Sequence, residues 1–329
     1  MLAYFGRRLL LGVLTVWAIT IISFGIIQLP PGDFATAYVT QLQAEGVILT
    51  DADKANIRAE FGLDDPLYLK YVKWVRHVAQ GNFGMSMEWR RPVADVIGDR
   101  LLLTAVVSIA AILFTWAVAL PIGIYSAVRQ YTVGDYVASV VGFIGLAVPS
   151  FLIALVLMYL GFALFGADVG GLFSSDYQDA PWSLAKVVDL LKHLPLPAVV
   201  LGLGGTAGLI RILRANLLDE LRKPYVVTAR SNGLRARDLI LKYPVRVALN
   251  PFASTVGYLF PQVVSGSIIV SLVLGLPTVG PLLLRALTQQ DMYLAATIIL
   301  MLGVMTVVGT FVSDLILLWV DPRIRLEGK

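Results

Sequence analysis

Long apolar runs without a single charge constrain this chain more than any other feature of its sequence. Neither Leu9–Leu29 nor Leu101–Val128 contains a charged residue. A helix of about 20 apolar residues crosses the hydrocarbon core of a bilayer, and a helix satisfies its backbone hydrogen bonds internally, as lipid requires. The sequence therefore predicts an all-α polytopic membrane protein. A composition of 57% hydrophobic and 15% charged residues agrees with this class, because soluble domains carry about 25% charged residues.

Six apolar runs are present, and we interpret each as a membrane span. They are Leu9–Leu29, Leu101–Val128, Tyr136–Ala167, Leu194–Ile210, Ala248–Leu276 and Met292–Val320. Loops on the cytoplasmic side carry the excess of Lys and Arg, and the charge of the segments between the runs places both termini inside. The predicted organisation is an amphipathic start with the first span over 1–32, a helical insert over 33–100, and a five-span core over 101–329.

The insert over 33–100 is the one sizeable polar stretch, and we expect it outside the cytoplasm. Its ten acidic and eight basic residues give it a net charge of −2. Thr50-Asp51-Ala52-Asp53 resembles a capping box at the start of a helix that Gly62 closes. Asp65-Pro66 begins a second predicted helix, which ends at Gly81. The sequence thus predicts a small helical periplasmic insert between spans 1 and 2.

A basic segment, 213–247, separates the fourth and fifth spans. From Arg211 to Arg246 there are nine Lys and Arg against three Asp and Glu. Ala215–Glu220 and Tyr225–Ser231 are predicted helices, and Asn232-Gly233 is a helix stop, because glycine takes the left-handed position after a helix without a Cβ penalty. The pattern indicates a helix, a glycine turn and another helix on the cytoplasmic face. Nucleic-acid binding is disfavoured, since the basic residues flank membrane spans.

The basic segment also resembles a known family. The run Tyr225-Val-Val-Thr228-Ala229-Arg230-Ser-Asn-Gly233-Leu234, with Pro251 downstream, is similar to the EAA loop of binding-protein-dependent ABC importer permeases, above all the dipeptide, oligopeptide and nickel group. The tail from Asp321 to Arg325 resembles that of the same group. The resemblance implies that Tyr225, Thr228, Ala229, Arg230, Gly233 and Leu234 form the loop that docks on a cytoplasmic ATPase. Val227, Ser231 and Asn232 depart from the family pattern, and a solvated basic helix pair on the membrane surface is the alternative.

The same resemblance implies partners and a location. The chain would pair with a second, homologous permease subunit, two cytoplasmic ABC ATPase subunits and a periplasmic substrate-binding protein, within lipid of a bacterial inner membrane. ATP and Mg²⁺ would be bound by the ATPases, and no cofactor or metal by this chain. Peptide is the favoured substrate, with oligosaccharide, opine and nickel as alternatives. The sequence does not predict which residues line the substrate pathway.

Motifs for chemistry within this chain are missing or weak. No Walker A sequence occurs, so ATP would have to be bound by another chain. Gly202-x-Gly204-x-x-Ala207 matches a loose dinucleotide fingerprint, but it lies in an apolar run, and we interpret Gly204 and Gly208 as sites of close helix packing. The two histidines lack ligand spacing, and no nucleophile motif is present. A transport subunit without catalytic residues is predicted; a stand-alone secondary carrier or channel, or a membrane-embedded enzyme, is the rival class.

Overall fold

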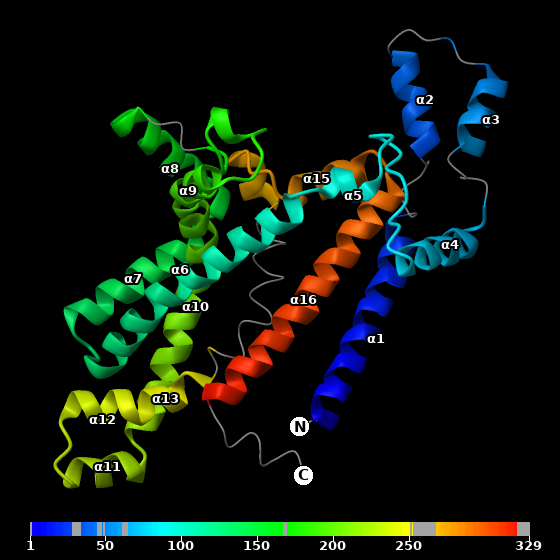
Figure 1. Cartoon of the computed structure of the whole chain (residues 1–329). Coiled ribbons are helices and arrows are strands. Elements are labelled where there is room, and N and C mark those ends of the chain that lie inside the picture. The colour runs from blue at the N-terminus through cyan, green and yellow to red at the C-terminus, as the bar shows by residue number, and fades with distance from the viewer. Residues whose placement is uncertain are drawn as a thin grey trace. The chain divides into compact units, whose positions relative to one another are not determined.

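The computed structural model describes residues 2–27, 34–44, 48, 50–60, 65–166, 170–250, 252 and 268–320. Within these residues the chain is helical, and its only β pairing is an isolated bridge between Met85 and Pro92. The chain divides into two compact units (Figure 1). Unit 1 comprises 1–4, 104–277 and 308–329, and unit 2 comprises 5–103 and 278–307. The all-α prediction is therefore confirmed for the described residues.

Unit 2 holds the first span and the insert. Its helices are α1 (Leu2–Ile27), α2 (Phe34–Ala44), α3 (Asp51–Glu60), α4 (Leu67–Ala79), α5 (Val93–Ile97), α15 (Val279–Thr288) and the first part of α16 (Met292–Val320). The predicted capping box is confirmed: Asp53 N–H donates to Thr50 Oγ1 at 3.2 Å, and Thr50 N–H donates to Asp53 Oδ2 at 2.9 Å. The hydrogen bonds from Thr50 to the exposed Asp53 carboxylate lower its pKa below the ordinary value.

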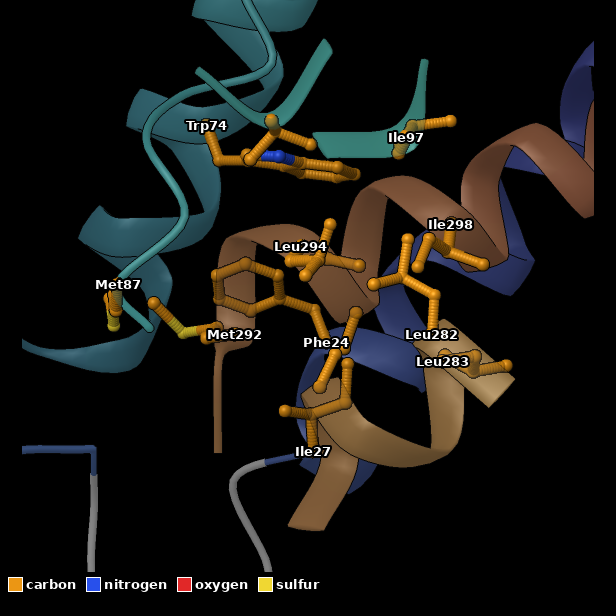
Figure 2. Packing of buried hydrophobic residues seen from close by; sticks show 14 of the residues in the cluster. Phe24, Ile27, Trp74, Met87, Ile97, Leu282, Leu283, Met292, Leu294 and Ile298 are labelled. Atoms are coloured by element: carbon orange, nitrogen blue, oxygen red, sulfur yellow. The ribbon is translucent and has the colours of Figure 1, made fainter. Parts of the chain in front are cut away.

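An apolar core joins the insert to the membrane helices of unit 2 (Figure 2). Trp74 of α4 and Phe24 of α1 are each at most 2% exposed, and their ring centroids lie 5.7 Å apart. Leu282 of α15 and Leu294 of α16 are buried in the same cluster. The apolar side of the amphipathic helix α4 therefore packs on the ends of membrane helices, and the insert is an integral part of this unit.

Asp291 holds the start of α16 in place. Its side chain is fully buried and accepts hydrogen bonds from Ser86 Oγ, from Glu88 N–H at 3.1 Å and from Leu294 N–H at 3.2 Å. The last of these is a helix cap, because Leu294 is in the first turn of α16 and its amide has no partner within the helix. Asp291 thus connects the insert to α16 with one carboxylate.

Removing this carboxylate should destabilise unit 2. Asp291→Ala leaves buried donors without an acceptor and deletes a helix cap, so we expect a loss of about 2 kcal/mol. A lower thermal midpoint of the purified protein in detergent would measure it. Asp95→Ala, which removes an exposed carboxylate of the same unit, is the control and should change stability by less than about 0.5 kcal/mol. Equal midpoints for the two variants would contradict the role given to Asp291.

Unit 1 contains most of α6 (Arg100–Val128) and the core helices. These are α7 (Val133–Ala147), α8 (Ser150–Phe165), the short 3₁₀ helix η1 (Ser175–Tyr177), α9 (Leu184–His193), α10 (Pro195–Leu221), α11 (Pro224–Ser231), α12 (Ala236–Lys242), α13 (Pro244–Ala248) and the end of α16. Four helices of the described chain are long and apolar enough to cross a membrane, namely parts or all of α1, α6, α10 and α16. The protein is thus a multi-pass membrane protein.

The predicted third span differs from the structure, and most of the predicted fifth span is not tested by it. The run Tyr136–Ala167 is not one straight span, because α7 and α8 meet at 103°. Pro149 lacks an N–H and disfavours helical backbone at the residue before it, and Val148 is accordingly extended. Counted as one broken span, the pair brings the total to five. Most of the predicted fifth span, Ala248–Leu276, lies outside the described residues, as do Pro251 and the tail from Asp321 to Arg325, so the six-span count stays a prediction.

Candidate coupling site

The fourth span is longer than predicted, and this decides how the basic segment is held. α10 continues without interruption from Pro195 to Leu221, so the helix predicted over Ala215–Glu220 is its final part. No glycine or proline interrupts the chain from Ile210 to Leu221, and Leu213 and Leu217, four residues apart on one face, are fully buried. The prediction that the span ends at Ile210 was therefore wrong.

A hairpin of short helices follows the end of α10. α11 begins at Pro224, whose fixed φ suits the first helical position. At its end, Asn232 N–H donates to Thr228 O at 3.1 Å, and Gly233 N–H donates to Arg230 O at 3.0 Å. Gly233 has φ +77, a left-handed conformation that costs a residue with a side chain about 1–2 kcal/mol. The predicted glycine turn is confirmed, and α12 follows it directly.

Two apolar side chains that the sequence analysis did not single out anchor the hairpin. Val226 of α11 and Leu239 of α12 are each 1% exposed, whereas most other side chains of the two helices are exposed. α12 packs on α13, and α13 packs on α10. The spacing of apolar residues along each helix was the signal that could have identified them. α11 and α12 are too short, however, for such spacing to show which apolar residues are buried. The hairpin is thus fixed to the end of α10 (Figure 1).

The six residues predicted to form the site lie on this hairpin, at its surface or turn. Tyr225 is exposed and its hydroxyl donates to Glu220 Oε2 at 2.6 Å, which links α11 to the end of α10. Thr228 Oγ1 donates to Pro224 O at 3.1 Å, and Ala229 is half-buried. Arg230 and Gly233 are exposed, and Leu234 is exposed just after the turn. The structure therefore brings the predicted residues together on one short element.

The hairpin and α13 expose apolar and basic side chains together. Val227 of α11 is 59% exposed. The other exposed large apolar residues of this region are Tyr225, Leu234, Leu241, Tyr243 and Val247, and its exposed basic residues are Arg222, Lys223, Arg230, Arg235, Arg237, Lys242 and Arg246. A cluster of exposed apolar groups among charges is typical of a protein-binding surface.

An ion pair joins α10 to the first turn of α7, close in sequence to the hairpin. Arg214 Nη2 lies 3.0 Å from Asp135 Oδ2, and the Asp135 side chain is 4% exposed. The same carboxylate oxygen accepts from Tyr131 N–H at 3.0 Å. The loop between α6 and α7 is shaped for this contact, since Thr132 caps α7 and Tyr131 has φ +61. The sequence analysis did not find this pair, because its members are 79 positions apart.

Within this chain, Gly202 is a glycine of α10 at which another helix approaches closely, whereas Gly204 and Gly208 make no such approach to the described residues, and their predicted role in packing stays a prediction. A Cβ at Gly202 would lie 2.6 Å from Phe114 Cδ1 and 2.8 Å from Ala111 O of α6. At Gly208 a Cβ would meet nothing within 4 Å, and at Gly204 only Ser150 Oγ at 4.0 Å. Thr115 Oγ1 donates to Gly202 O at 2.9 Å across the same contact. Gly202, Gly204 and Ala207 all lie inside α10, so the dinucleotide fingerprint lacks the strand that it needs.

The hairpin directly follows a membrane helix that contacts other helices of the same unit. The membrane helix α10 carries the hairpin after its C-terminal end, and it contacts α6 at Gly202 and α7 at Asp135. No group of three or more His, Asp or Glu side chains placed to hold a metal ion is found among the described residues. The described chain is thus a helical membrane protein with an exposed helical hairpin next to the end of one of its long apolar helices.

The chain belongs to the family described as binding-protein-dependent transport system inner membrane component. Residues 119–326 match the family itself, and residues 1–110 match its N-terminal domain. The chain is 32% identical to the oligopeptide transport system permease protein AppB of Bacillus subtilis, over 99% of this chain and 100% of AppB. It is 33% identical to a putative peptide permease protein of Brucella ovis and 28% identical to the oligopeptide transport system permease protein OppB of Escherichia coli, again over 99% of this chain and 100% of each relative. The resemblance that the sequence indicated is thus confirmed.

Proposed function

We propose that this protein is a non-catalytic permease subunit of an ATP-driven importer, and that the α11–α12 hairpin is the element on which a cytoplasmic ATPase docks. The observation that carries the proposal is the mounting of the hairpin. It is anchored by Val226 and Leu239 and follows directly from α10, so a force applied to it reaches a membrane helix without an intervening flexible joint. Family membership supports the same role.

The hairpin surface suits a large protein partner. Val227, Leu234 and Leu241 offer apolar contact area, and the surrounding Lys and Arg side chains would steer and orient an acidic cleft. ATP and Mg²⁺ are bound by the partner ATPases in this proposal, since the chain has no Walker A sequence. ATP-driven closure of two ATPases would displace the hairpin and, through α10, the helices bound to it at Gly202 and Arg214.

The complete importer in this proposal contains a second homologous permease, two ATPases and a substrate-binding protein. The hairpin and both termini face the cytoplasm of a bacterium, and the insert faces outward, because the Lys and Arg excess lies on the hairpin side. Peptide is the proposed substrate, supported by the similarity to AppB and OppB, which are named as oligopeptide transport permeases. A stand-alone carrier or channel is the alternative, and it would transport without ATP.

Gly233→Val should impair transport while leaving the membrane helices folded. A Cβ at Gly233 would meet nothing within 4 Å, so the substitution acts through backbone strain at φ +77 rather than through a clash. The strain is about 1–2 kcal/mol, and the turn must relieve it by changing shape. The fraction of protein that docks correctly on the ATPase should therefore fall roughly 5- to 30-fold. ATP-dependent uptake into proteoliposomes, with equal amounts of folded protein, measures the effect.

Gly233→Asn is the matched control, because asparagine tolerates the left-handed conformation. It should retain most of the uptake that Gly233→Val loses. Full ATP-driven uptake by the valine variant, at equal ATPase recovery, would contradict the docking role of the turn.

A further inference from the structure

Helix α9 presents its apolar side outward and its polar side inward. Leu184 is 82% exposed and Leu191 is 58% exposed. With Val187 and Val188, which are also exposed, they occupy positions i, i+3, i+4 and i+7 and so form one stripe along the helix. The opposite side holds Lys186 and Asp189, both buried. We name the four apolar residues the α9 stripe.

The buried polar side of α9 is fully engaged within its own loop. Lys186 Nζ donates to Ala180 O at 2.6 Å and lies 4.9 Å from the centroid of the Phe173 ring. Asp189 accepts from Ser174 N–H at 2.8 Å and from Ser174 Oγ at 2.6 Å. Burial raises the pKa of Asp189, but these hydrogen bonds outweigh it and bring the pKa below the ordinary value.

These contacts fix the rotation of α9 about its axis. Turning the α9 stripe toward the loop would break the bonds to Ser174 and to Ala180 and leave a carboxylate and an ammonium group unpaired. Loss of such buried charged hydrogen bonds costs several kcal/mol. The outward orientation of the stripe is therefore held by the loop itself, and an apolar surface outside the described chain must cover it.

The position of α9 in the chain indicates what that surface is. α9 ends at His193, and the membrane helix α10 begins at Pro195, so the last residue of the stripe, Leu191, lies within a few residues of the helix that enters lipid. α9 lies at the end of α10 opposite the α11–α12 hairpin (Figure 1). Trp182, which is 41% exposed, precedes the helix, and exposed Lys192 flanks the stripe.

We propose that α9 is an interfacial helix whose apolar stripe is embedded in the bilayer, at the boundary between headgroups and acyl chains. Amphipathic helices of this kind bury their apolar side about 5–10 Å into that boundary, and Trp and Lys side chains are favoured at the same level. The occupant is phospholipid, with its phosphate beside Lys192. α9 lies in the outer leaflet if the orientation given under the proposed function holds, so this choice of leaflet rests on the proposed function. The contact of the stripe with lipid does not.

Spin-label accessibility tests the proposal, and the chain is suited to it because it contains no cysteine. Leu184→Cys and Leu191→Cys carry a nitroxide label on the stripe, and Asp176→Cys carries one on an exposed polar position of the same loop. The full chain is reconstituted in vesicles of phosphatidylethanolamine and phosphatidylglycerol, alone and as the complex that co-purifies with it. Collision with apolar O₂ and with polar nickel ethylenediaminediacetate is measured at each label.

The lipid proposal predicts a several-fold higher ratio of O₂ to nickel-complex accessibility at Leu184 and Leu191 than at Asp176, both in the chain alone and in the complex. Low accessibility to both reagents in the complex would show that a protein partner covers the stripe, and would overturn the proposal. High accessibility to the nickel complex would show a water-exposed stripe and would also overturn it. Co-purification of ATPases is measured separately. Failure of the importer assignment can therefore be distinguished from failure of the lipid proposal.

Labels at these two positions should leave the fold intact, because both leucines are largely exposed. Leu184→Ser and Leu191→Ser, made together, provide a second measurement. Loss of the stripe should lower the yield of folded protein in vesicles but not in detergent micelles, where detergent adapts to the altered surface. An unchanged yield in vesicles would count against a lipid-embedded helix.

Discussion

Replacing Gly202 with alanine is expected to prevent α6 and α10 from packing, although only one carbon atom is added. The new Cβ would lie 2.8 Å from the backbone oxygen of Ala111 and 3.0 Å from Thr115 Oγ1, and a backbone oxygen cannot move away without moving α6. The hydrogen bond from Thr115 Oγ1 to Gly202 O would lengthen or break as the helices separate. Overpacking of this kind costs about 1–3 kcal/mol, so the yield and thermal midpoint of purified protein should fall clearly.

Gly208→Ala is the matched control for this change. It adds the same atom to the same helix, six residues on, where a Cβ would meet nothing within 4 Å. Both substitutions raise helix propensity to the same extent, so any difference between them reports on packing against α6. A thermal midpoint of Gly202→Ala equal to that of Gly208→Ala would show that the helices do not approach each other as described.

Breaking the Asp135–Arg214 pair is expected to have the second large effect. Arg214→Gln leaves the buried Asp135 carboxylate without its cation, and because the Arg214 side chain is 30% exposed we expect a loss at the lower end of the range for buried ion pairs, about 3 kcal/mol. The double variant Asp135→Asn with Arg214→Gln removes both charges and should recover most of the loss. A double-mutant cycle on thermal stability would then give a coupling energy of about 1–3 kcal/mol.

An exposed pair provides the control for this cycle. Lys73 Nζ lies 2.6 Å from Asp65 Oδ2, but the Lys73 side chain is 53% exposed. Solvent screens such a pair, and Lys73→Gln should cost less than about 1 kcal/mol. If Arg214→Gln lowered the stability no more than Lys73→Gln does, the ion pair between Arg214 of α10 and Asp135 of α7 would not hold the two helices together as we describe. An ion pair of this strength also explains how motion of the hairpin could reach α7.

Local features of this chain could be predicted from its sequence. The capping box at Thr50 and Asp53, the turn at Gly233 and the helical character of the apolar runs each depend on residues close together in the chain. Membership of the permease family was also visible, because its motifs are short and contiguous. These predictions succeeded since backbone preference and hydrophobicity act over one or two helical turns.

Features that depend on distant residues could not be predicted in the same way. α10 contains four glycines, any of which its sequence allows to pack closely, and the position of Phe114 and Ala111 on α6 selects Gly202. The Asp135–Arg214 pair joins two helices whose register the sequence does not give. In α9 the apolar periodicity is present in the sequence, but periodicity indicates which side is apolar and not which side is buried, and lipid reverses the usual relation between the two.

The measurement that tests the central proposal most directly is affinity purification of this chain from native membranes, with identification of the proteins that accompany it. We expect a second permease, ATPase subunits and a substrate-binding protein, and we expect transport by the reconstituted complex to require ATP. Ligand retained by the binding protein would identify the substrate. Recovery of this chain alone, active in transport after reconstitution without ATP, would contradict the assignment as an importer subunit.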